Sequence, residues 1–98
     1  MRNGMPFVRS TIARHVGCPS RALHPRQRLE RDLDLTPLEL VLIAIEIEEA
    51  FGIGISIEGL AGVGTLGDLM RFFSHALSSR RMERRQYGAH RLLLGDAE

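Results

Sequence analysis

The sequence has no lysine and no tryptophan, only one cysteine and one tyrosine, and no apolar run long enough to cross a membrane. With Cys18 alone, an internal disulfide is excluded. A spanning helix needs about 20 apolar residues, and the first ten residues lack the apolar segment of a secretory signal, so we expect a cytoplasmic protein. All thirteen basic residues are arginine, which we attribute to GC-rich, bacterial coding rather than to phosphate binding.

Catalytic and metal-binding patterns are also missing. Asp32 and Asp34 have no identifiable acid partner, and we expect them to supply favourable charge near the start of the next helix. The glycines around residue 60 match no phosphate-binding loop. The histidines lack the paired spacing of a helical metal site, and we expect solvated side chains at His15, His24, His75 and His90. The sequence therefore predicts neither an enzyme nor a metal protein.

The net charge of +1 conceals three blocks of different sign. Residues 1–29 contain six arginines and no acid, residues 30–68 contain nine acids against Arg31, and residues 69–98 contain six arginines and three acids. Separated blocks indicate that the acidic middle and the basic ends have different roles.

Residues 37–51, PLELVLIAIEIEEAF, are the most apolar stretch and are predicted to form a helix. Thr36 and Glu39 have the spacing of a capping box, in which each side chain accepts from the backbone N–H of the other residue. Pro37 suits the first helical position, and Gly52 is a natural stop. Because its only polar side chains are glutamates, this helix either lies inside a bundle or keeps apolar surface for a partner.

Two segments precede this helix. Residues 7–16 place apolar side chains at helical spacing and are followed by Gly17, which predicts an amphipathic helix. Residues 18–30 contain two prolines and are predicted to form a long polar loop. We expect Leu23 and Leu29 to anchor that loop to the core.

Two segments follow it. The glycine-rich residues 52–64 contain alternating isoleucines, which fit either a short strand or one helical turn over residues 57–61. Thr65 and Asp68 form a second capping pattern, which opens a final amphipathic helix to about residue 78. Together these elements predict an all-α fold over residues 1–78, with three principal helices, a short fourth one, and a long loop between the first two. Residues 79–98 are predicted to be a basic tail or an extension of the last helix.

Several short motifs follow one another in a familiar order: Asp32-Leu33, then Leu38, then EEAFGI at residues 48–53, then Gly67-Asp68. From about residue 7 to residue 77 the chain resembles an acyl carrier protein. The resemblance implies a bundle of three or four helices and a role in fatty-acid, polyketide or related acyl metabolism. It also implies a serine, in a D-S-L motif, that carries 4′-phosphopantetheine.

Pro37 departs from this pattern at the attachment position, because D-S-L aligns with Thr36-Pro37-Leu38. Proline has no hydroxyl with which to form the phosphodiester. Thr36 is a weak substitute, since it lies one residue early and its hydroxyl is better used as the helix cap. The G-A-D that usually precedes the serine is replaced by Asp34-Leu35-Thr36. The resemblance therefore implies a carrier fold without its cofactor.

The second helix is the surface that carriers present to partner enzymes, through acidic side chains that meet basic patches. Leu40 and Leu42 stand where threonine-like and acidic residues are usual. With Val41 and Ile45 they are predicted to form an exposed apolar patch, which usually marks a binding site. Both a distinct protein partner and a homodimer stay open. The leading prediction is a protein-binding module that docks through Glu39, Leu40, Leu42, Ile45, Glu48 and Glu49.

Two alternatives remain. The chain could be a true carrier, modified at another residue or holding an acyl chain non-covalently between its helices. The residues for such a cavity, for which core packing is the simpler role, are Ile43, Ile47, Phe51, Leu69 and Phe73.

The second alternative is a small regulator that binds nucleic acid through Arg80, Arg81, Arg84, Arg85 and Arg91. The acidic middle of the chain argues against it.

Overall fold

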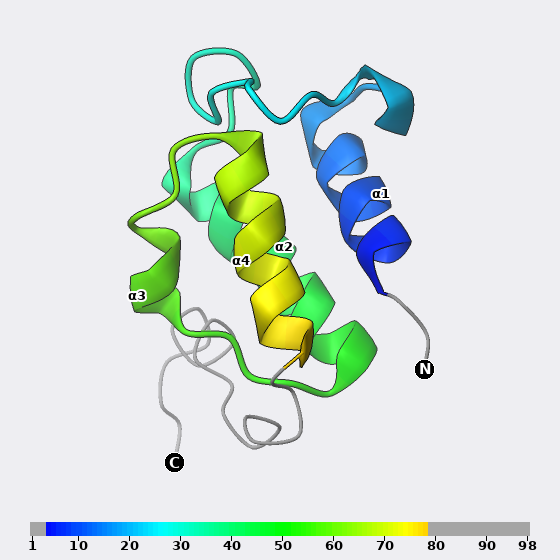
Figure 1. Ribbon diagram of the computed structural model, residues 1–98, viewed down its shortest axis with the longest axis vertical. Helices are drawn as coiled ribbons and strands as arrows, with labels where there is room; N and C mark the ends of the chain where they lie inside the picture. Colours follow the sequence, from blue (N-terminus) through cyan, green and yellow to red (C-terminus); the bar gives the residue numbers. More distant parts are fainter. Residues whose placement is uncertain (1–3, 79–98) are drawn as a thin grey trace.

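The computed structural model describes residues 4–78, and this part of the chain is helical (Figure 1). The elements in chain order are α1 (Met5–Val16), a short 3₁₀ turn η1 (Ser20–Ala22), α2 (Pro37–Phe51), α3 (Ile57–Leu60) and α4 (Leu66–Ser78). Both α1 and α3 contact α2 and α4, and they lie on opposite sides of those two helices (Figure 1). The predicted all-α bundle with a short third helix is confirmed.

The predicted bounds of α2 are confirmed, and local capping explains them. The backbone N–H of Glu39 donates to Thr36 Oγ1 over 3.2 Å, and Gly52 ends the helix with a φ of 66°, a conformation that glycine adopts without strain. The capping box is only half formed, since the Glu39 carboxylate bonds to His15 on α1 instead. At α4 the box is complete, with Asp68 N to Thr65 Oγ1 at 3.1 Å and Thr65 N to Asp68 Oδ2 at 3.3 Å.

The long connection between α1 and α2 is more ordered than a structureless loop. It contains the turn η1, and its second half pairs with the segment that enters α4 through a bridge between Arg28 and Thr65. Leu29 N donates to Gly64 O over 3.0 Å, and Leu66 N donates to Gln27 O over 2.8 Å. The expected anchors Leu23 and Leu29 are both buried. The loop is therefore fixed against the α3–α4 junction.

For the segment after α2, the predicted helical turn is confirmed and the alternative, a short strand, is wrong. Ile53 and Ile55 are buried without forming a strand, and α3 begins at Ile57. The buried carboxylate of Glu48 accepts from Ile55 N over 2.8 Å, which gives this backbone a partner that a strand would otherwise supply. At Gly59 a methyl group would overlap the ring of Phe72, so glycine permits the close approach of α3 to α4.

The predicted basic tail or helix extension over residues 79–98 lies outside the described residues, as do the five tail arginines. In residues 4–78, no helix has the length and apolar character needed to cross a membrane.

Thr11 offers a test of the core. Its side chain is 1% exposed, and its hydroxyl has no hydrogen-bond partner in the described part of the chain. A buried unpaired hydroxyl is costly, so we expect Thr11→Val to raise the free energy of unfolding by about 1 kcal/mol. The matched control is Thr36→Val, which removes the α2 cap and should lower it by about 1 kcal/mol. Urea unfolding measures both, and a destabilised Thr11→Val variant would contradict this account of the core.

Candidate functional site

The start of α2 has a proline at the position where the resemblance places the attachment serine. Pro37 is the first residue of the helix and is exposed. The neighbouring hydroxyl, on Thr36, accepts the cap hydrogen bond from Glu39 N. Leu38, the next residue, is 57% exposed. The structure thus presents a ring and an apolar side chain where the resemblance places a modified serine.

The approach to this position is a tight turn over residues 28–35. Asp32 organises it, because its Oδ2 accepts from Arg28 N over 2.7 Å, and Leu35 N closes the turn on Leu29 O over 2.8 Å. Asp34 has a φ of 57°, in the left-handed region that aspartate tolerates better than most residues. The resemblance has glycine at this position, so Asp34 keeps the backbone conformation that such a glycine supplies.

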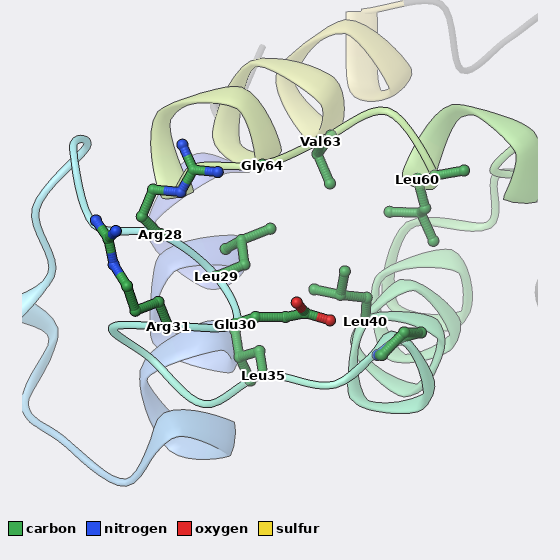
Figure 2. Close-up of a pocket in the computed structure, with 11 residues that line it drawn as sticks. Arg28, Leu29, Glu30, Arg31, Leu35, Leu40, Leu60, Val63 and Gly64 are labelled. Atoms are coloured by element: carbon green, nitrogen blue, oxygen red, sulfur yellow. The ribbon is translucent and has the colours of Figure 1, made fainter.

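A pocket of about 440 Å³ opens beside the start of α2. Figure 2 shows that its walls come from the 28–35 turn, from α2, and from α3 and the segment that follows it. The apolar side chains that line it are Leu29, Leu35, Pro37, Leu40, Leu60, Ala61 and Val63. Three charged side chains, Arg28, Glu30 and Arg31, complete the lining.

The cavity residues predicted from the sequence do not line this pocket. Ile43, Ile47, Leu69 and Phe73 are fully buried in the common core. Phe51 is partly buried and packs edge-on against Phe7, with ring centroids 5.5 Å apart. Core packing, the simpler of the two roles considered, describes these five residues. Sequence reasoning missed the actual lining because it brings residues 28–40 together with residues 60–64, which are distant in the chain.

The expected docking surface on α2 needs correction. Leu40 is 9% exposed and lines the pocket, and Glu48 is fully buried with its carboxylate on Ile55 N. Val41 and Ile45 are half-buried and pack against the core, Leu42 is half-buried, and Glu49 is exposed. The most exposed apolar side chain of the helix is Leu38, which sequence reasoning did not assign to the patch. Helical spacing from Leu38 to Leu42 could have indicated it.

His15 is the largest departure from the sequence-based expectation, because it joins two helices instead of lying in solvent. Its Nδ1 is 2.7 Å from Glu39 Oε1, its Nε2 is 2.7 Å from Glu46 Oε2, and its side chain is 14% exposed. Arg14 adds a contact of 2.8 Å to the other oxygen of Glu46. Three ion pairs thus connect α1 to two of the four acids of α2.

This network shifts the pKa values of its members. Burial lowers the pKa of His15, but hydrogen bonds to Glu46 and Glu39 outweigh burial and raise it above the usual histidine value. The hydrogen bond from Arg14, helped by His15, holds the pKa of the Glu46 carboxyl below its usual range. Because ionised carboxylates only accept, two carboxylates facing both ring nitrogens favour the doubly protonated imidazolium.

No group of three potential ligand side chains in residues 4–78 is arranged to hold a metal ion.

Comparison with known proteins identifies the fold of the site. Residues 6–73 match the family described as "Phosphopantetheine attachment site". Acyl carrier protein 3 of Ralstonia nicotianae is 33% identical over 73 residues, which cover 74% of this chain and 84% of that protein. The meromycolate extension acyl carrier proteins of Mycobacterium leprae and Mycobacterium tuberculosis are each 31% identical over 65 residues, 66% of this chain and 56% of their own length.

The His15 network makes stability depend on pH. A raised folded pKa means that protonated His15 stabilises the fold fully below the unfolded histidine pKa of about 6.5. This contribution is lost as the pH rises through the folded value. We expect His15→Gln to lower the free energy of unfolding by about 1 kcal/mol in mildly acidic solution and by less at higher pH.

Urea unfolding over a pH series measures this difference, with His75→Gln, an exposed position on α4, as the control. The lowered pKa of Glu46 works in the opposite sense, since its contribution is lost as the pH falls through that value. A His15→Gln effect that does not change with pH would show that the imidazolium is not the stabilising form.

Proposed function

The chain belongs to the acyl carrier protein family, and we propose that it is a member that docks onto protein partners without carrying 4′-phosphopantetheine. The observation that supports this most is Pro37, which occupies the first position of α2 where we align the attachment serine. The hydroxyl of Thr36 is engaged as the helix cap. In this proposal the chain performs no chemistry of its own and acts in the cytoplasm as an accessory module of acyl metabolism.

The docking surface that we propose is a strip on α2, defined by Leu38, Leu42, Ile45 and Glu49. Their spacing of three and four residues places them along one side of the helix. Leu38 is 57% exposed. Leu42 is half-buried, but it is not one of the apolar side chains that pack against the core. Burying such side chains on a partner favours association.

Charge distinguishes this docking strip from a strongly acidic one. Glu48 is buried, and Glu39 and Glu46 are paired with His15 and Arg14. With one of these acids buried and the other two paired, the surface of α2 offers mainly apolar side chains beside Glu49. We therefore propose partners with an apolar groove rather than a strongly basic patch, either enzymes of acyl metabolism or a second carrier.

Leu42→Glu tests the docking strip. We expect it to weaken partner binding at least tenfold, because a charge must then be buried at the centre of the contact. The matched control is Ser74→Glu, which adds the same charge at an exposed position on α4. Affinity capture from the source cells compares both variants with the unaltered chain, and partners lost only with Leu42→Glu are quantified by mass spectrometry.

Sedimentation of the unaltered chain over a concentration series separates a homodimer from a distinct partner. Equal capture by the unaltered chain and Leu42→Glu, with no change in oligomeric state, would contradict docking through this strip.

The pocket favours a second candidate, a carrier that holds an acyl chain non-covalently. Its volume of about 440 Å³ lies within the range of small-molecule sites, and Leu29, Leu40 and Leu60 give it apolar walls. A native mass spectrum with a co-purified lipid would favour this candidate over the first, and a spectrum of the bare chain would count against it.

A further inference from the structure

The pocket beside α2 contains a carboxylate as well as apolar walls. Figure 2 shows the side chain of Glu30 extending among the apolar side chains toward Leu40. Arg28 and Arg31 also line the pocket, but in Figure 2 their side chains extend away from the apolar side chains that Glu30 approaches. Of the three charged side chains of the lining, Glu30 is therefore the one directed at the apolar wall.

Glu30 makes no ion pair or side-chain hydrogen bond within residues 4–78. The adjacent cation, Arg31, instead contacts Asp32, with Nε 3.5 Å from Oδ1. Water can solvate the exposed carboxylate of Glu30. A ligand that fills the apolar part of the pocket displaces that water, which is costly unless the ligand supplies a partner for the charge.

We propose that this pocket binds a small aliphatic amine. The ammonium group pairs with the Glu30 carboxylate in a charge-assisted hydrogen bond, and the alkyl chain packs against Leu40, Leu60 and Val63. A volume of about 440 Å³ accommodates a short chain of this kind. Pro37 belongs to the lining, but no residue of the docking strip does, so the amine site can fail without affecting docking through α2. The amine would compete for this pocket with the acyl chain of the second candidate function.

The position of Glu30 also sets the order of preference among head groups. A fatty-acid carboxylate would bring a like charge next to Glu30, which is unfavourable. A neutral alcohol would offer the Glu30 carboxylate a single hydrogen bond, from its hydroxyl, and no opposite charge. The amine alone offers an opposite charge and several donors.

Titration with octylamine, octan-1-ol and octanoate tests the proposal, because the three probes share one chain and differ in head group. Binding is followed by the amide NMR shifts of Leu60 and Val63, below the concentrations at which the probes aggregate. We expect octylamine to bind at least about fivefold more tightly than octan-1-ol. Glu30→Gln should remove this preference while leaving the affinity for the alcohol unchanged.

The control variant is Glu58→Gln, an exposed acid of α3 that does not line the pocket, and it should retain the preference for the amine. Because Glu30 makes no side-chain bond within the described residues, Glu30→Gln should also unfold at the same urea concentration as the unaltered chain. Tightest binding of octanoate, lost in Arg28→Gln, would overturn the proposal in favour of an anionic ligand. Binding of none of the probes, or a preference for amine that survives Glu30→Gln, would also overturn it.

Discussion

Helix α2 presents almost no polar face to water, and the neighbouring elements are placed so that most of it is covered. Ile43, Ala44 and Ile47 have no exposed surface, and such burial is the main favourable contribution to folding. Helix α1 covers one side of α2, and α3 covers another. The turn over residues 28–35 leads into its first residue, and the α2–α3 connection folds back onto its last turn through Glu48.

The same constraint explains why the acids of α2 behave differently from those of an open recognition helix. A helix covered on several sides brings its glutamates close to neighbouring elements, where each needs a partner. Glu46 and Glu39 find theirs on α1, in His15 and Arg14, and Glu48 finds one in the backbone of Ile55. Contacts that hold the bundle together thus remove charge from the surface through which we propose that the chain docks.

The helices were largely predictable from the sequence because their signals are local. Thr36, Pro37 and Gly52 lie within or next to α2, and Thr65 and Asp68 lie at the start of α4. The site was less predictable, because it depends on long-range contacts. His15 meets Glu39 and Glu46 across 24 and 31 positions, and the pocket joins residues 28–40 to residues 60–64. Nothing in the alternation of Ile53 and Ile55 reveals that Glu48, rather than a neighbouring strand, bonds to their backbone.

The absence of the attachment hydroxyl is the central claim, and intact mass tests it most directly. The chain is co-expressed with a broad-specificity phosphopantetheinyl transferase, beside a variant that carries Pro37→Ser and Thr36→Asp. Aspartate caps a helix as well as threonine does, so the variant should fold while regaining the serine. The account predicts an unmodified native chain and a variant that gains one 4′-phosphopantetheine. A native chain that gains this mass would contradict it, and peptide mapping would then show which hydroxyl is used.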